Sequence, residues 1–206
     1  MKIITISREF GSGGRELGKR IADILGVDYY DSEIISAVAK NSGMDQNYVE
    51  KCMDNHGWQD FTISYRGTIG SSAYLAASRI ELLVQQKKVI EQIAALGKDC
   101  VIVGRNADVI LEQYHPFNIF VCASLEAKLR RCKERAKEGE NLSDKELLRR
   151  MKDIDKTRAR TRELLSGTPW GQREAYHLCV NTSEWEMREL APAVADYVNR
   201  WFGRNL

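Results

Sequence analysis

The sequence predicts an α/β fold in which a parallel sheet is covered by helices on both faces. Short, continuously apolar runs alternate along the 206 residues with longer segments whose apolar residues recur every three or four positions. The runs are typical of strands buried on both faces, and the spacing is typical of helices that pack one face inward. The composition, 43% hydrophobic and 29% charged with only three prolines, is that of a folded globular protein. Strands that alternate with helices favour a parallel sheet.

The strands are expected in five segments that are rich in β-branched and aromatic residues. These segments cover 2–7, 27–31, 99–104, 117–124 and 176–183. In a parallel sheet, ligands bind at the carboxyl ends of the strands. Four residues at such ends therefore mark the expected binding edge: Ser7, Asp31, Gly104 and Ala123.

The helices of the first half are placed by residues that can begin or end a helix. Gly26 ends the helix after the first strand, and Gly97 ends a long helix over 73–96. Asp31 or Ser32 can cap the helix that follows the second strand.

The helices of the second half are placed in the same way. A helix very rich in Lys and Arg is expected over about 125–138. Ser143 with Glu146, and Ser183 with Glu186, match the S-x-x-E capping box that opens a helix. The sequence therefore predicts that the last two helices begin at these two serines.

Charge and cysteine content narrow the class of protein. The 31 basic and 29 acidic residues leave a net charge of +2, which gives no case for nucleic-acid binding. The five cysteines form no C-x-x-C pair, so reduced thiols and a cytoplasmic location are expected. The chain has no signal-peptide core and no apolar run near the ~20 residues that a membrane span needs.

The glycine cluster G-S-G-G at 11–14 is the first candidate site, because it lies between a predicted strand and a predicted helix. Glycine turns backbone N–H groups inward, and a helix N-terminus adds positive charge, so an anion is favoured. The P-loop pattern G-x-x-x-x-G-K-[ST] fits only in part. If Gly13 is its second glycine, Arg8, Gly14 and Arg15 stand at the first glycine, the lysine and the hydroxyl.

Two interpretations of this cluster stay open. It can be a structural turn between strand and helix, and the dinucleotide pattern G-x-G-x-x-G fails because Glu16 stands at its last glycine. Against a purely structural role, Arg8, Arg15 and Lys19 bracket the loop. Arginine binds phosphate oxygens in a bidentate way, so it can supply the charge of the missing lysine.

Other arginines have a functional and a structural interpretation each. Arg105 follows Gly104 at the end of a strand, where it can face a ligand or cap a helix. Arg131 and its neighbours can form a solvated charged face of the helix, or they can neutralise the negative charge of a transferred phosphoryl group. Asp155 and Arg158 are three residues apart on one helix, a pairing that contributes only ~0.2–0.5 kcal/mol. The three histidines show no metal spacing, and His177 is interpreted as structural.

Six segments in order along nearly the whole chain carry a resemblance to a known family. They are ITISREFGSGG (4–14), YYDS (29–32), VGRN (103–106), FNIFVCASLEAKLRR (117–131), DKTR (155–158) and HLCVNTS (177–183). They resemble the successive motifs of the cytidylate kinase family, and more closely its divergent cytidylate kinase-like branch. No single segment is specific, but their order is.

This resemblance implies the three-layer fold of P-loop nucleoside monophosphate kinases, with a five-stranded parallel sheet and a small lid. It implies a single domain over 1–206, with an acceptor-binding segment at about 42–72 and a lid at about 128–162. The implied reaction is ATP-dependent phosphorylation of a small nucleotide, CMP or dCMP, with Mg²⁺. The metal ligands and the oligomeric state are left unassigned.

The resemblance also implies roles for individual residues. The ATP phosphates would be bound by Arg8, Gly11, Ser12, Gly13, Gly14, Arg15 and Glu16. The acceptor would be bound by Asp31, Ser32, Arg105, Asp155 and Arg158. The catalytic charges would come from Arg15, Arg131 and Arg158, with Arg135 as a further candidate. Asp31 could also serve Mg²⁺ through water, or the accepting oxygen.

The chain departs from the family pattern where phosphate chemistry is expected. Gly14 replaces the loop lysine, and Arg15 and Glu16 replace the hydroxyl residues that follow it. Two alternatives to a cytidylate kinase therefore stay open. One is a non-catalytic module that binds a nucleotide or another phosphorylated ligand. The other is a kinase for a different acceptor, because residues 44–72 are unlike those of the family.

Overall fold

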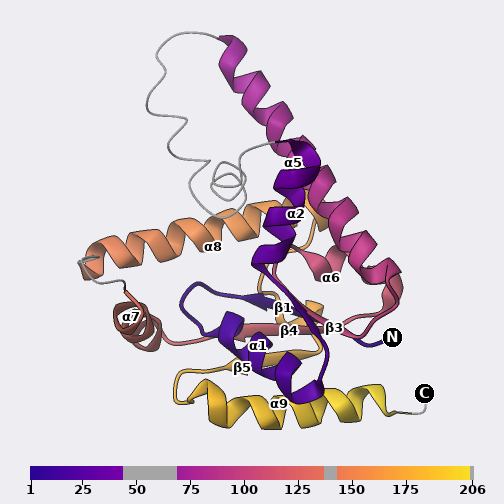
Figure 1. The fold of residues 1–206 in the computed structure, drawn as a ribbon. Coiled ribbons are helices and arrows are strands. Elements are labelled where there is room, and N and C mark those ends of the chain that lie inside the picture. Colours follow the sequence, from indigo (N-terminus) through magenta and orange to yellow (C-terminus); the bar gives the residue numbers. More distant parts are fainter. Residues whose placement is uncertain (44–68, 137–142, 205–206) are drawn as a thin grey trace. The chain divides into compact units, whose positions relative to one another are not determined.

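The structure is a computed structural model that describes residues 1–43, 69–136 and 143–204 (Figure 1). The chain forms two compact units. One consists of Met1–Asp31 with Gly97–Leu206, and the other is Ser32–Leu96. Most of the predicted acceptor segment at 42–72 lies outside the described residues. The division into domain, acceptor segment and lid stays a prediction.

The larger unit is built on a five-stranded parallel sheet, which confirms the predicted fold class. Its strands are β1 (Ile3–Arg8), β2 (Asp28–Tyr30), β3 (Cys100–Val103), β4 (Phe117–Cys122) and β5 (Leu178–Asn181). The order is β2-β3-β1-β4-β5, and all neighbouring strands are parallel. β1 is therefore the central strand, and the loop that follows it lies in the middle of the carboxyl edge.

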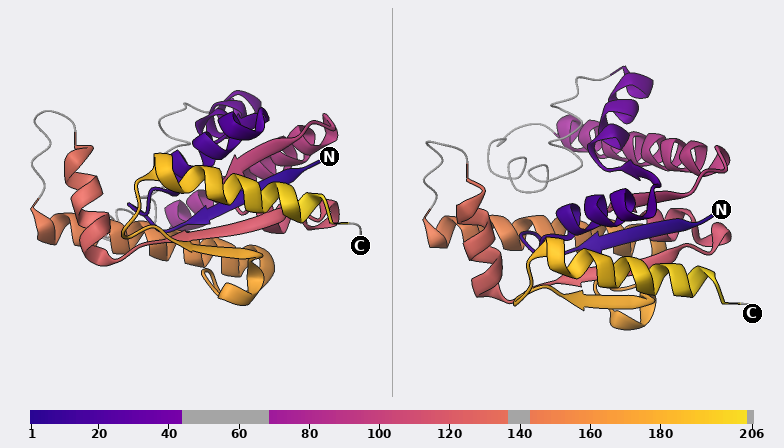
Figure 2. Two further views of the ribbon diagram at one scale, coloured as in Figure 1. Left: turned by 90° about the horizontal axis from the view of Figure 1, so that it is seen from below. Right: turned by 60° about the horizontal axis from the view of Figure 1, so that its bottom comes forward.

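Helices cover both faces of this sheet, as Figures 1 and 2 show. The helices α1 (Gly14–Leu25) and α9 (Met187–Phe202) lie on one face, and α6 (Ala107–Ile110) and α8 (Asp144–Ser166) on the other. Leu17 and Ile21 of α1 are fully buried in one hydrophobic cluster with Ile6 and Val103 of the sheet. Gly18 stands where a Cβ would meet Ile6 Cδ1 at 2.8 Å, so the absence of a side chain lets α1 approach the sheet closely.

The predicted helix boundaries are only partly correct. The capping box at Ser143 is confirmed, since its N–H donates to Glu146 Oε2 (2.8 Å) and its Oγ accepts from the Glu146 N–H. The second predicted box is wrong, because α9 begins at Met187 with Glu186 as its N-cap residue. Ser183 instead accepts a hydrogen bond from the Ser124 N–H (2.7 Å). Its hydroxyl therefore joins the residues after β4 to those after β5.

Three further elements complete the larger unit. The helix predicted over about 125–138 is α7 (Leu125–Glu134), and it follows β4. The 3-10 segments η1 (Glu112–Tyr114) and η2 (Arg173–Ala175) precede β4 and β5. All three lie in the connections around β4 and β5, and α7 follows the carboxyl end of its strand.

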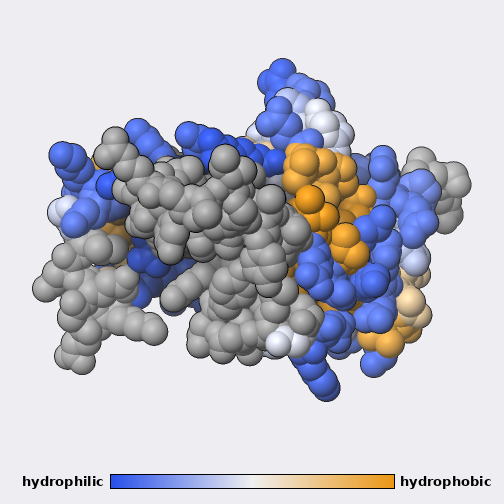
Figure 3. Space-filling model, turned by 90° about the horizontal axis from the view of Figure 1, so that it is seen from above, coloured by the Kyte–Doolittle hydropathy of each residue, from blue (hydrophilic) through white to orange (hydrophobic). Residues whose placement is uncertain are grey.

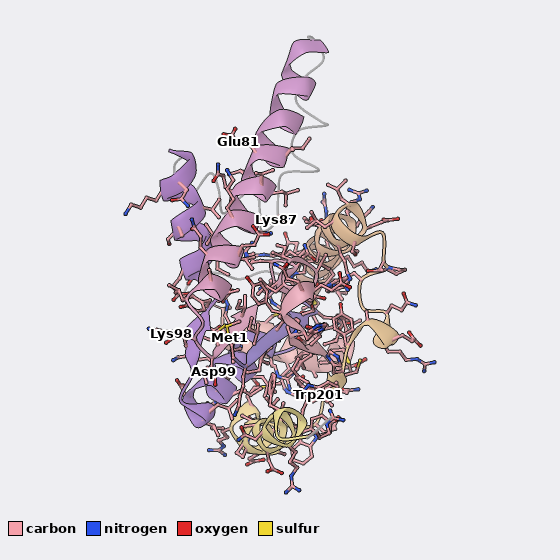
Figure 4. The ribbon with its side chains drawn as sticks, turned by 90° about the vertical axis from the view of Figure 1, so that its right-hand side faces the viewer. Met1, Glu81, Lys87, Lys98, Asp99 and Trp201 are labelled. Atoms are coloured by element: carbon pink, nitrogen blue, oxygen red, sulfur yellow. The ribbon has the colours of Figure 1, made fainter. Side chains whose placement is uncertain are left out.

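The smaller unit contains α2 (Ser32–Ser42) and α5 (Ile69–Ala95), so the long helix begins before the predicted residue 73. Glu81 and Lys87 lie on α5 (Figure 4). Ile80 and Val84 of α5 are exposed, and the face seen in Figure 3 carries a hydrophobic area beside hydrophilic surface. None of the described helices has the length and hydropathy that crossing a bilayer requires.

Aromatic side chains occupy the amino end of the sheet. The Phe117 ring, at the start of β4, stacks on His177 with ring centroids 5.4 Å apart. Trp201, on α9 (Figure 4), lies 4.5 Å from the His177 ring. His177 Nδ1 accepts a hydrogen bond from the Asn118 N–H (2.9 Å), and burial lowers the pKa of its imidazole. These contacts support the structural interpretation of His177.

Candidate functional site

The loop between β1 and α1 is fixed by hydrogen bonds from its own backbone. The Glu9 N–H donates to the Val121 carbonyl (3.0 Å), and the Phe10 N–H donates to Asp155 Oδ1 (2.8 Å). The Ser12 hydroxyl donates to the Glu9 carbonyl (2.9 Å). The first amides of α1 have no carbonyl one turn earlier in the helix, so they can receive an anion.

The loop contains an exchange of residues between positions 8 and 14. A Cβ added to Gly14 would lie 2.6 Å from Arg8 Cβ, so Arg8 fills the space beside Gly14. In the P-loop pattern, position 8 is the first glycine and position 14 the lysine. The arginine at the first position is thus sterically compatible only with a glycine at the second. Two departures from the pattern are one compensated change.

The Arg8 guanidinium runs across the end of β3 and reaches Asp31. A Cβ on Gly104 would lie 1.5 Å from Arg8 Nη1, so the guanidinium covers this glycine directly. Arg8 Nη2 lies 3.8 Å from Asp31 Oδ1, and Arg15 Nε pairs with Asp31 Oδ2. The Asp31 side chain is 4% exposed and that of Arg15 65%. Three of the predicted residues therefore form one cluster with two positive charges and one negative charge.

Lys19, the third basic residue expected to bracket the loop, takes no part in this cluster. Its Nζ pairs with Asp23 Oδ1 (2.7 Å) one turn later on α1 and lies over the Tyr29 ring. The structure thus leaves Arg8 and Arg15 as the predicted bracketing residues that reach the carboxyl edge.

Asp155 and Arg158 bring α8 onto the loop. Asp155 Oδ1 accepts from the Phe10 N–H and from Arg158 Nη1 (3.0 Å). Arg158 Nη1 also donates to the Arg8 carbonyl (2.9 Å). Burial raises the pKa of Asp155, and Arg158 and the Phe10 amide oppose that rise. Both predicted residues therefore touch the loop, and their pairing does more than stabilise an isolated helix.

Arg131 is held by the main chain after β5. Its buried guanidinium donates to Thr182 Oγ1 (3.1 Å), to the Thr182 carbonyl and to the Trp185 carbonyl (3.2 Å). The Thr182 hydroxyl in turn donates to the Ser12 carbonyl (2.6 Å). Arg131 therefore supports the loop through Thr182, and its catalytic assignment stays a prediction.

Glu16 stands in the first turn of α1 and is neutralised by two arginines. Its Oε1 accepts from Arg20 Nε (2.9 Å), and its Oε2 pairs with Arg135, the residue after α7. A carboxylate beside a phosphate would repel it, so this pairing removes an obstacle to anion binding. It also engages Arg135, whose side chain is 54% exposed, in a contact between the C-cap of α7 and the first turn of α1.

Two residues of the site were missed from the sequence. Lys128 Nζ pairs with Glu9 Oε2 (2.9 Å), which also accepts from the Ala123 N–H (3.3 Å). A Cβ on Gly11 would lie 3.2 Å from Lys128 Cβ, so α7 packs directly on the loop. A lysine thus does reach the loop between β1 and α1, but it comes from α7 and not from position 14. No local pattern links positions 9 and 128.

Two further residues, Arg105 and Ser32, are predicted to bind the acceptor. Arg105 follows Gly104 at the carboxyl end of β3, and its φ is 60°, with 52° at Asn106. Ser32 is the first residue of α2 and belongs to the smaller unit. Their roles stay predictions.

The side chains of this site could bind Mg²⁺ only together with the phosphate oxygens of a substrate. Within residues 1–43, 69–136 and 143–204, no three His, Cys, Asp or Glu side chains gather in a way that could hold a metal ion. Mg²⁺ commonly binds through substrate phosphates and one or two carboxylates. Asp31 is buried at the carboxyl edge and fits that pattern as a single carboxylate.

Comparisons with known proteins agree with this arrangement. The model of the cytidylate kinase-like family matches residues 3–184. An uncharacterized protein from Eubacterium ventriosum ATCC 27560 has a similar crystal structure, with a TM-score of 0.70, 23% identity, and coverage of 97% of this chain and 99% of that chain. No curated protein sequence matches the chain.

Two shikimate kinases share the fold at lower identity. The enzyme from Acinetobacter baumannii, in complex with shikimate, has a TM-score of 0.54 and 14% identity over 99% of this chain and 96% of that chain. The enzyme from Bacteroides thetaiotaomicron has a TM-score of 0.57 and 13% identity over 96% and 98%. At such identities the likeness concerns the fold alone.

Proposed function

Because this chain belongs to the cytidylate kinase-like family, we propose that it transfers a phosphoryl group from ATP to a nucleoside monophosphate, with CMP or dCMP as the expected acceptor. The observation that carries this proposal is the phosphate loop itself. Its glycines, its hydrogen-bonded backbone and the Arg8–Gly14 exchange, at the centre of the carboxyl edge, support an anion-binding role for this turn. A structural turn would need none of the surrounding positive charge.

The donor phosphates would bind the amides of residues 11–14 and the first turn of α1. Arg15, which is exposed and paired with Asp31, would supply one charge. Lys128, held on Glu9 against the loop, would supply the ammonium that Gly14 cannot. Phosphoryl transfer depends mostly on positioning and on neutralising the charge of the transferred group.

The acceptor would bind beside Asp155 and Arg158, which contact the Phe10 amide and the Arg8 carbonyl. Arg158 would neutralise phosphate charge, and Asp155 would hold the Arg158 guanidinium in its orientation. Arg105, at the end of β3, would also contact the acceptor, and Ser32 is a further candidate from the sequence. Asp31 is the carboxylate expected to help hold Mg²⁺, which would supply positive charge toward the donor phosphates.

Measurement of ADP formation from Mg·ATP with CMP, dCMP, UMP, AMP and GMP tests the proposal. We expect turnover with a cytosine nucleotide, and a loss on the order of a hundredfold in Arg15→Ala and in Lys128→Ala. Arg200→Ala is the matched control, since Arg200 forms an exposed pair with Asp196 on α9. Turnover that is equal in all four proteins would contradict a role of this loop in transfer.

A second candidate is a non-catalytic module that binds a nucleotide or another phosphorylated ligand. It is favoured by Arg15, which stands where a hydroxyl would help to bind Mg²⁺ and is paired with Asp31. ATP binding by calorimetry without turnover of any acceptor would support this module. Turnover of a different acceptor alone would support the kinase with another substrate. Absence of ATP binding would refute the donor site.

A further inference from the structure

We infer that the buried ion pair between Asp108 and Arg162 is a positioning device that sets where α8 presents Asp155 and Arg158 to the phosphate loop. The pair lies outside the residues that would touch either substrate. Its functional consequence rests on the proposed phosphotransfer, but its structural consequence does not.

The pair is almost completely enclosed. The side chains of Asp108, on α6, and Arg162, on α8, are 3% and 5% exposed, and Arg162 Nη1 pairs with Asp108 Oδ2. The guanidinium carbon lies 5.3 Å from the centre of the Tyr176 ring, and this ring lies 5.0 Å from that of Phe120. Among the described residues, nothing accepts a hydrogen bond from the buried Arg162 Nε.

Such a pair is a poor choice for stability alone. Both ions lose their hydration, and the unpaired Nε shows that the compensation is incomplete. Apolar residues of similar volume often replace buried ion pairs without loss of stability. A hydrogen-bonded ion pair is directional, whereas an apolar contact is not. The ion pair therefore holds two elements at one relative position.

The position that it holds is that of the loop-binding part of α8. Arg162 is one helical turn after Arg158, so the two side chains project from the same face. Asp108 follows a turn in which Gly104, Arg105 and Asn106 all have positive φ, of 74°, 60° and 52°. The pair therefore joins this turn at the end of β3 to the helix whose Asp155 binds the Phe10 amide. A shift of α8 would move Asp155 and Arg158 together.

The test replaces both charges with apolar groups, in Asp108→Leu combined with Arg162→Met. We expect a melting temperature close to that of the wild type, because the apolar pair fills the same space. Exchange of the Phe10 amide with deuterium, followed by NMR, should become about tenfold faster, since Asp155 no longer holds it steadily. In phosphotransfer assays, kcat/KM should fall by about tenfold or more, since small misplacements at a reacting centre have large effects. The matched control is Asp196→Leu with Arg200→Met, an exposed pair on α9.

A second variant guards against a folding defect. Arg162→Lys keeps the positive charge but loses the planar guanidinium, so we expect a folded protein with intermediate Phe10 exchange. A double variant that unfolds would show that the pair is structural and would overturn the inference. Unchanged Phe10 exchange in a stable double variant would overturn it as well. If the wild type transfers no phosphate, the proposed function fails, and the exchange measurement alone decides whether the pair positions α8.

Discussion

The two ends of the central sheet differ in the kinds of side chain that surround them. The carboxyl end is a network of charges around glycine backbone, formed by Arg8, Glu9, Asp31, Lys128, Asp155 and Arg158. The amino end is a cluster of rings, formed by Phe117, His177, Tyr197, Trp201 and Phe202. The same five strands pass between them. In parallel α/β sheets, ligands bind beyond the carboxyl ends, so the amino end is free to serve stability.

The role expected of a charged or aromatic residue therefore depends on the end of the sheet at which it lies. At the carboxyl end, polar groups are held in place by other polar groups, and a ligand can join the network. At the amino end, His177 lies among aromatic rings, and its Nδ1 already accepts a hydrogen bond from the Asn118 amide. Changes at the first end should alter activity, and changes at the second should alter the free energy of unfolding.

The largest effect is expected at Gly14. Gly14→Ala places a Cβ 2.6 Å from Arg8 Cβ, in the middle of the network. We expect ATP affinity to fall by at least on the order of a hundredfold, and the free energy of unfolding to fall by about 2 kcal/mol, the usual effect of overpacking. Calorimetric titration with ATP and urea unfolding measure the two changes.

The matched control for Gly14→Ala removes the clashing side chain instead. Arg8→Gly combined with Gly14→Ala should recover stability relative to Gly14→Ala, so the two changes should be strongly non-additive. Gly26→Ala adds a Cβ at a φ of 66° with nothing within 4 Å, and it should leave ATP binding unchanged. Additive effects of the two changes would refute the exchange between positions 8 and 14.

The next effect would separate two arginines that the sequence treats alike. Arg131 is buried against Thr182 and Trp185, whereas Arg158 binds the loop and is 25% exposed. Arg131→Ala should lower the free energy of unfolding by about 2–3 kcal/mol, because buried carbonyls lose a charged donor. Arg158→Ala should lower kcat by about tenfold to a hundredfold with a smaller loss of stability. Urea unfolding and turnover of both variants measure this, and the reverse pattern would contradict it.

Much of the fold could be predicted because local pattern determines it. Segments rich in β-branched and aromatic residues contain all five strands, and Ser143 with Glu146 marks the start of α8. The box at Ser183 has the same pattern and fails. Its hydroxyl is taken by the Ser124 amide, a partner 59 residues away, which no local pattern can reveal.

The candidate site could be predicted less completely, for the same physical reason. The turn between strand and helix at residues 11–14, and the nearby Arg8 and Arg15, follow from the order of residues alone. The pairing of Lys128 with Glu9 spans 119 residues, so it depends on how α7 packs. The burial of Arg131 is equally invisible in a run of basic residues. Sequence predicts which groups could bind phosphate, and packing decides which are already engaged.

The smallest effect is expected at the amino end and concerns pH. Burial and the nearby Arg204 charge lower the pKa of His177 below the usual histidine value of 6.5. As the pH falls through that value, the unfolded chain takes up a proton before the folded protein does, so the free energy of unfolding must fall. The loss is complete once the pH lies below the folded pKa. Protonation of Nδ1 would also remove the acceptor for the Asn118 amide.

His177→Asn should flatten this part of the pH dependence, because its amide oxygen can accept the same hydrogen bond without titrating. Urea unfolding between about pH 8 and pH 5, around the pKa of histidine, measures it. His115→Asn is the matched control, since His115 is exposed and its φ of 50° suits asparagine. If His115→Asn flattened the profile and His177→Asn did not, the amino end would not be the pH-sensitive part. Turnover at about pH 8, where His177 is neutral in both states, should be the same in both variants. A loss of turnover in His177→Asn alone would show that the two ends of the sheet are not independent.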